Sequence, residues 1–103
     1  MNPLFARQVI HAERITIARV FLAPGSVVPR HHHENEQITV LERGALKFIF
    51  DDGEAVIQAG EVMQIPPNAP HSVEALEESE GLDLFSPIRS DWLQGDDAYL
   101  RSK

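Results

Sequence analysis

The sequence predicts an all-β fold, a small sandwich or barrel, for three reasons. Short runs rich in apolar and β-branched residues recur along the 103-residue chain. Glycine, proline and Asp-Gly signals separate these runs, which is the spacing of an all-β protein. Only one stretch, near the end, has the features of a helix. We therefore expect a single all-β domain over residues 1–103 with one modest core.

The predicted strands and turns follow one another along the chain. The runs of strand character are residues 14–25, 36–44, 45–53, 54–61, 62–71 and, as two strands with a break near 79–81, residues 71–90. Asp52-Gly53 predicts a tight hairpin, because both residues tolerate positive φ. Three prolines within residues 66–70 argue against a helix or a central strand there. A short helical segment is expected over residues 90–100, where Ser90 can cap the first turn.

Composition narrows the classes of function. The formal net charge is -7, and because an acidic surface repels phosphate backbones we expect no nucleic-acid partner. No run approaches the roughly 20 apolar residues of a membrane span, and residues 1–15 lack the apolar core of a signal peptide. We therefore expect a cytoplasmic protein without membrane contact. Since the chain has no cysteine, any metal must be held by histidine, carboxylate or amide side chains.

The candidate site is the run RHHHENEQ, residues 30–37. Three adjacent histidines alone are often an inert surface cluster, so the neighbouring residues must show whether the run is a metal site. If this run is extended, one face carries His31, His33, Asn35 and Gln37, and the other carries His32, Glu34 and Glu36. The first face suits a barrel interior and the second suits solvent. A third imidazole can come from His71, after the proline-rich turn, and three imidazoles with one amide oxygen suit a divalent transition metal.

Two motifs resemble those of the cupin superfamily. Residues 25–44 read G-SVVPR-HHH-ENE-Q-ITVLER-G, which is similar to the first cupin motif, with Gln37 where the common pattern has Glu. Residues 60–71 read G-EVMQI-P-P-N-AP-H, which is similar to the second motif, with Asn68 where the pattern has glycine. Both Asn and Gly tolerate positive φ. The resemblance implies an RmlC-like cupin fold, a double-stranded β-helix or jelly-roll barrel with the metal inside, and a homodimer.

A narrower resemblance is to the pectin-degradation cupins of the KdgF type, which open unsaturated uronates to linear keto sugars. It is carried by HHHENEQITVLERG, IPPNAPH and LDLFSPIRSDWL. The metal ligands that it implies are His31, His33, Gln37 and His71. The family's Asp-x-Phe-x-x-x-Arg segment falls on Asp83, Phe85 and Arg89, with Ile88 where the common form has a second proline. The resemblance implies that Asp83 and Arg89 act in turnover, and that Phe85 and Arg89 contact a sugar acid.

Several alternatives stay open from the sequence. The metal can be nickel, iron, manganese, zinc or cobalt, because all accept this ligand set. The function can also be that of a metal-dependent dioxygenase on a small molecule, or of a non-catalytic module that binds a sugar or a metal. Asp83 and Phe85 share one face of a predicted strand, opposite Leu82 and Leu84. If that face is internal, burial raises the pKa of Asp83 while a metal lowers it.

Overall fold

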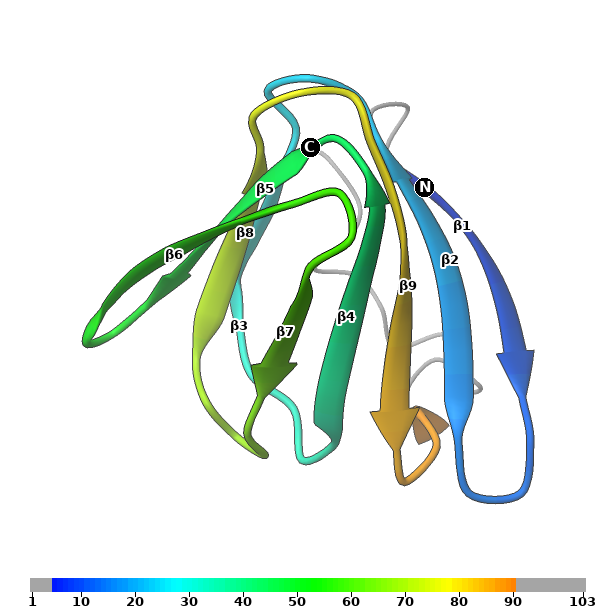
Figure 1. The fold of residues 1–103 in the computed structure, drawn as a ribbon. Helices are drawn as coiled ribbons and strands as arrows, with labels where there is room; N and C mark the ends of the chain where they lie inside the picture. Colours follow the sequence, from blue (N-terminus) through cyan, green and yellow to red (C-terminus); the bar gives the residue numbers. More distant parts are fainter. Residues whose placement is uncertain (1–4, 91–103) are drawn as a thin grey trace.

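The computed structural model of the chain describes residues 5–90. This part of the chain folds into strands β1 (Phe5–His11), β2 (Thr16–Leu22), β3 (Val27–His31), β4 (Glu36–Arg43), β5 (Ala45–Phe50), β6 (Gly53–Gln58), β7 (Val62–Ile65), β8 (His71–Ala75) and β9 (Ser79–Ser86). One antiparallel sheet has the order β1-β2-β9-β4-β7 and the other β3-β8-β5-β6. The two sheets face each other as the walls of a barrel (Figure 1). The predicted all-β double-sheet fold is therefore confirmed.

The expected C-terminal helical segment, residues 90–100, lies outside the described residues except for Ser90. Within residues 5–90 the structure contains no helix of the length and apolar character that crossing a membrane requires.

The hydrophobic core lies between the two sheets. Strand β2 illustrates the pattern, since its alternate residues from Thr16 to Leu22 are buried while Ile17 points outward. The core combines side chains of both sheets, namely Ala18, Val20, Leu22, Leu41, Ile65 and Phe85 from one and Val28, Leu46, Phe48, Ile57, Val73 and Ala75 from the other. This packing fixes the separation of the sheets, so that polar side chains at one end of the barrel meet at defined distances.

Gly44 is the point at which the chain leaves one sheet for the other. It joins β4 of the five-stranded sheet to β5 of the four-stranded sheet. Its φ is 95°, and a Cβ there would collide with the carbonyl oxygen of Glu78 and with the backbone of Ser79. No other residue fits this position without displacing the turn that precedes β9.

The hairpin predicted at Asp52-Gly53 is present, but its turn lies one residue earlier. Phe50 pairs with Gly53, so Asp51 and Asp52 form the two-residue turn between β5 and β6. Gly53, with φ 152°, already belongs to β6. The prediction placed the turn on the residues that tolerate positive φ, whereas the pairing of the two strands decides where it falls.

Candidate metal centre

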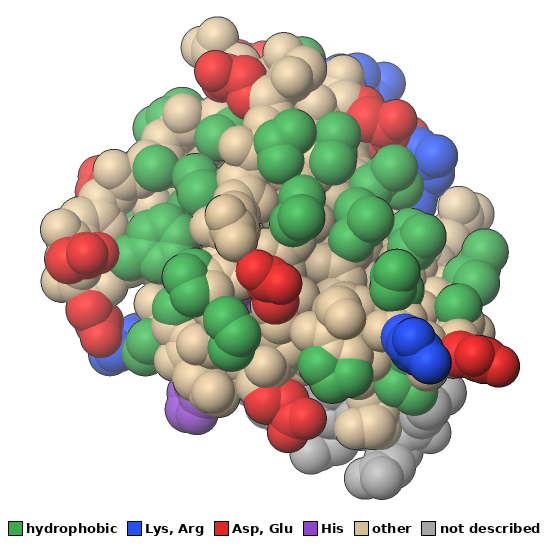
Figure 2. All heavy atoms as spheres, turned by 60° about the horizontal axis from the view of Figure 1, so that its bottom comes forward, with side chains coloured by type: hydrophobic (Ala, Val, Ile, Leu, Met, Phe, Trp, Pro, Cys, Tyr) green, Lys and Arg blue, Asp and Glu red, His purple; other side chains and the backbone are tan. Residues whose placement is uncertain are grey.

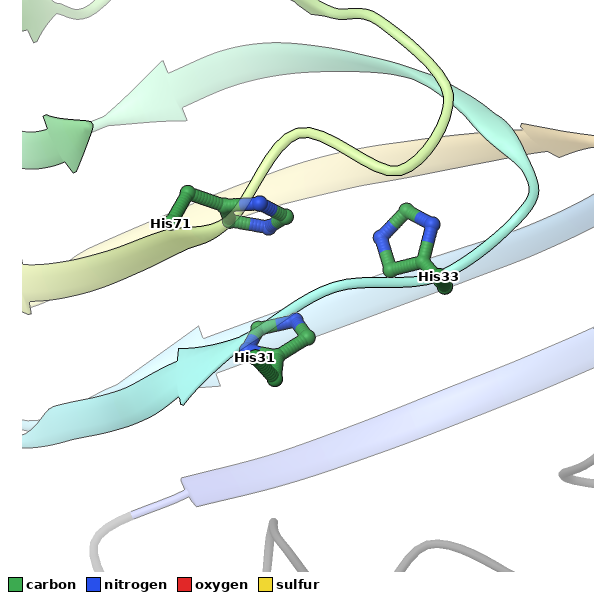
Figure 3. A group of neighbouring side chains, drawn as sticks. All are labelled: His31, His33 and His71. Atoms are coloured by element: carbon green, nitrogen blue, oxygen red, sulfur yellow. The ribbon is translucent and has the colours of Figure 1, made fainter. Parts of the chain in front are cut away.

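Three histidine rings converge at one end of the barrel. His31 ends β3 and pairs with His71, which begins β8, while His33 lies in the connection between β3 and β4. Figure 3 shows the three rings turned toward one another. The ring centroids of His31 and His71 are 4.4 Å apart, and one ring nitrogen from each of the three histidines lies within 4.8 Å of the others. The structure thus brings together the three predicted histidines from two separate motifs.

The run from His31 to Gln37 is not the extended segment that the parity argument assumed. Strand β3 ends at His31 and β4 begins at Glu36, so the run crosses from one sheet to the other. The predicted alternation nevertheless holds. His33, Asn35 and Gln37 are buried, whereas His32, Glu34 and Glu36 are exposed. The crossing keeps the inward side chains on the inner surface of the barrel.

Backbone carbonyls fix the tautomer of all three rings. The Nδ1 atom of His31 lies 2.8 Å from the carbonyl oxygen of Pro29, and that of His71 lies 2.8 Å from the oxygen of Ala69. The Nδ1 of His33 lies 3.0 Å from the carbonyl oxygen of residue 35. Because a carbonyl only accepts, each Nδ1 must carry the proton and donate it. In each neutral ring the Nε2 therefore carries the lone pair, which is what a metal ligand requires.

Burial keeps the three rings neutral. It is the main reason why the pKa values of His31 and His33 fall to about 4. The pKa of His71 is also lowered, again chiefly by burial. The positive charge of Arg89 lowers all three pKa values further. At neutral pH the site therefore offers metal-binding imidazoles without competition from protons.

Gln37 completes the predicted ligand set. Its Oε1 lies 3.0 Å from the Nε2 of His33, while its Nε2 donates to the hydroxyl of Thr39 at 2.9 Å. Since His33 carries its proton on Nδ1, two lone pairs face each other across this short distance. Such a contact is repulsive unless a cation accepts both lone pairs. The residues present therefore fit a divalent metal held by imidazole nitrogen and amide oxygen.

Asp83 lies on β9, beside the strand that carries Gln37. It pairs across the sheet with Thr39, whereas Phe85 pairs with Gln37. The Thr39 hydroxyl donates to Asp83 Oδ1 at 2.6 Å. Burial raises the pKa of Asp83 to about 6, although hydrogen bonds from Thr39 and Gln37 and the charge of Arg89 oppose that shift. Asp83, Thr39 and Gln37 line a cavity of about 40 Å³, which has room for water but not for a monosaccharide.

Phe85 and Arg89, two residues of the predicted segment, are both buried. Phe85 is 3% exposed and Arg89 is 1% exposed. The Phe85 ring meets the His33 ring edge-on, with centroids 5.5 Å apart. The guanidinium carbon of Arg89 lies 4.8 Å from the centroid of the Phe85 ring, on its face. A cation and an aromatic surface thus adjoin the histidines.

Asn35 ties the segment after β9 to the histidine loop. Its side-chain nitrogen donates to the carbonyl oxygens of Pro87 and, at 3.0 Å, of Ile88, and its backbone carbonyl oxygen accepts the Nδ1 proton of His33. The backbone N–H of Arg89 donates to the buried hydroxyl of Thr16 at 2.8 Å. Asn35 therefore links the position of Arg89, through its side chain, to that of a predicted metal ligand, through its backbone.

Thr39 was not among the residues expected at the site, although the alternation along β4 indicates it. Thr39 follows Gln37 by two positions, so it shares the inward face of β4. It is 1% exposed and polar among core residues, and a buried hydroxyl needs a partner. The inward alternation that includes Asn35 and Gln37, extended by two positions along β4, identifies Thr39.

Comparison with known proteins gives the same architecture. The structure of KdgF from a Halomonas species matches with a TM-score of 0.82 and 28% identity, covering 89% of this chain and 88% of that one. An RmlC-like cupin from Desulfovibrio desulfuricans matches with a TM-score of 0.73 and 27% identity, covering 82% and 83% of the two chains. The oxalate decarboxylase of Bacillus subtilis, which has Mn(II) centres, shares the fold at 19% identity and a TM-score of 0.77; the match covers 84% of this chain and 26% of that one.

No curated protein matches the chain. The sequence model of the cupin domain, however, matches residues 18–85. That span contains both motifs, the three converging histidines and most strands of the two facing sheets. Because the match covers more than half of the chain and agrees with its double-sheet barrel, the chain belongs to the cupin family.

Proposed function

We propose that this cupin is a metal-dependent enzyme that opens an unsaturated uronate to its linear keto form. The observation that carries the proposal is the convergence of three imidazole Nε2 lone pairs and one amide oxygen beside a buried arginine. The likeness to KdgF over 89% of the chain supports the choice of substrate class, since cupins of the KdgF type open unsaturated uronates. The small-molecule partner in this proposal is a sugar acid.

One divalent transition metal would be held by His31, His33, Gln37 and His71. All four donors are neutral, because burial lowers the pKa values of the histidines and Gln37 carries no charge. When bound, the ion supplies Lewis-acid stabilisation of negative charge that develops on substrate oxygens. Nickel, iron, manganese, zinc and cobalt all remain candidates for this ligand set.

The remaining residues would bind the substrate and move its protons. The charge of Arg89 favours an anionic ligand near the histidines, and a guanidinium can bind a carboxylate through two hydrogen bonds. The ring of Phe85 would pack against the sugar. Ring opening removes a proton from the anomeric hydroxyl and places one on carbon, and a carboxyl group with a pKa of about 6, as in Asp83, suits such transfers. A water in the cavity beside Asp83 would carry the proton to and from the substrate.

The test is loss of the ultraviolet absorbance of an unsaturated uronate on addition of metal-loaded protein. We expect turnover to fall by roughly 10²–10⁴-fold in Asp83→Asn, because the amide keeps the shape of the side chain but cannot transfer the proton. Glu77→Gln, an exposed carboxylate between β8 and β9, serves as control. Wild-type protein without any turnover would refute the proposal.

Oxygen uptake by the iron-loaded protein would indicate a dioxygenase, and tight sugar-acid binding without turnover would indicate a binding module.

We also propose that the protein is a homodimer that uses the outer face of its five-stranded sheet. An apolar row crosses four adjacent strands of this sheet. Ile10 on β1 pairs with Ile17 on β2, and Leu84 on β9 lies between Ile17 and Ile38 of β4. Ile10 is 71% exposed, Ile17 40% and Ile38 39%. Figure 2 shows hydrophobic side chains gathered over a broad area of the surface, and a continuous apolar row of this kind commonly marks an interface. A cytoplasmic location stays a prediction from the sequence.

A further inference from the structure

We propose that Thr39 is a positioning residue that turns the amide oxygen of Gln37 toward the metal centre. The inference rests on the metal site proposed above, but it assigns a role to a residue outside the ligand set. Thr39 and Gln37 are neighbours on the inward face of β4, and both are buried. Thr39 stands directly opposite Asp83 in the adjacent strand β9.

The direction of the hydrogen bonds follows from the chemistry of the three groups. A carboxylate oxygen only accepts, so the Thr39 hydroxyl donates its single proton to Asp83 Oδ1, at 2.6 Å. Toward Gln37 the same hydroxyl can then only accept. It accepts from the amide nitrogen of Gln37 at 2.9 Å. The amide nitrogen therefore points to Thr39, and the amide oxygen points to the histidines.

Without the Thr39 hydroxyl the opposite orientation of the amide would compete more strongly, because only the hydrogen bond from Gln37 to Asp83 would then oppose it. The two ends of a glutamine amide have nearly the same shape, so packing does not distinguish them. Turned around, the Gln37 nitrogen would take the place of the oxygen, 3.0 Å from His33 Nε2, and would donate to its lone pair. That arrangement satisfies both groups, but it removes the amide ligand and blocks an imidazole ligand. The Thr39 hydroxyl adds to the hydrogen bond with Asp83 in opposing it, because a reversed amide would leave two acceptors facing each other at Thr39.

The experiment compares Ni²⁺ affinity, by calorimetric titration of tag-free full-length protein, among variants of Thr39. Thr39→Val keeps the shape and removes the hydroxyl, and we expect it to weaken Ni²⁺ binding by about tenfold or more, the scale seen for groups that orient metal ligands. Thr39→Ser restores the hydroxyl and should rescue most of the affinity. Ser26→Ala, which removes a buried hydroxyl bonded only to the Ala23 carbonyl among the described contacts, is the matched control.

A double-mutant cycle separates positioning from general damage to the barrel. If Thr39 acts through Gln37, then Thr39→Val costs no further affinity in a Gln37→Ala background. The proposal is overturned if Thr39→Val binds Ni²⁺ like the wild type, if Thr39→Ser is as weak as Thr39→Val, or if the cost persists without Gln37. His33→Ala distinguishes the two levels of failure. If it binds Ni²⁺ as well as the wild type, the metal site itself is wrong, and the role of Thr39 falls with it.

Discussion

At the scale of single residues, the informative contacts are those between imidazole Nδ1 atoms and backbone carbonyls. Each of the three inward rings has one such contact, at 2.8 to 3.0 Å. His32 differs, because it is exposed to solvent although it lies between two of them in the sequence. The run of three histidines is therefore two inward ligand candidates separated by one outward residue.

This difference predicts opposite results for two adjacent substitutions. His33→Ala removes a converging Nε2 atom and should reduce metal content by about tenfold or more, because a ligand site with one donor fewer binds a divalent ion far more weakly. His32→Ala should keep the metal. The measurement is elemental analysis of protein purified without a histidine tag. Equal loss of metal in both variants would show that the inward and outward assignment is mistaken.

The convergence of three histidines could be predicted from the sequence, whereas the residues that orient them could not all be. The motifs predicted His31, His33 and His71, because their spacing reflects side-chain positions on a fixed barrel, and the family resemblance added Gln37. The role of Asn35 depends on two carbonyl groups more than fifty positions away. No local pattern in the sequence encodes a hydrogen bond of that kind, since it arises only when β9 lies beside β4.

At the scale of secondary-structure elements, the motif glycines were reliable guides to where strands end. Gly25, Gly44 and Gly60 adopt φ values of 80°, 95° and 90°, and Asn68, in the glycine position of the second motif, adopts 63°. The alternation of inward and outward side chains along a strand was an equally reliable guide to which residues are buried. Neither signal showed that the chain changes sheets between His31 and Glu36, because a change of sheet leaves the inward and outward alternation unaltered.

The segment that follows β9 should depend on Asn35. Asn35→Ala leaves the carbonyl oxygens of Pro87 and Ile88 without this donor, and we expect a loss of about 1–3 kcal/mol in the free energy of unfolding. Activity should fall too, because Arg89 is part of that segment. Urea denaturation and kcat/KM measure the two effects. Asn35→Asp, with similar volume but no donor, should be at least as damaging; wild-type stability in that variant would contradict the assignment.

At the scale of the whole molecule, the outer face of the five-stranded sheet is the proposed interface. The five-stranded sheet carries the continuous row from Ile10 to Ile38, with half-buried Leu84 inside it. If this face joins two copies, light scattering after gel filtration should give twice the chain's mass of 11.5 kDa. Ile38→Glu should shift the protein toward monomer, because a buried charge without a partner opposes association.

Val27→Glu is the matched control for this test, since Val27 is a 54% exposed apolar residue on β3 of the other sheet. It should leave the molecular mass unchanged. A wild-type monomer, or equal dissociation by both substitutions, would mean that the apolar row is not the interface.

The neutrality of the four ligand candidates has a further consequence for the loaded site. A divalent ion there would add two positive charges near the guanidinium of Arg89, and Asp83 is the carboxylate that the structure places beside the ligands. An entering anion would then lower the net positive charge at the site. By thermodynamic linkage, the ion and the anion must strengthen each other's binding by the same factor. Substrate would thus tighten metal binding by the same factor by which the metal tightens substrate binding, and each would bind more weakly when alone.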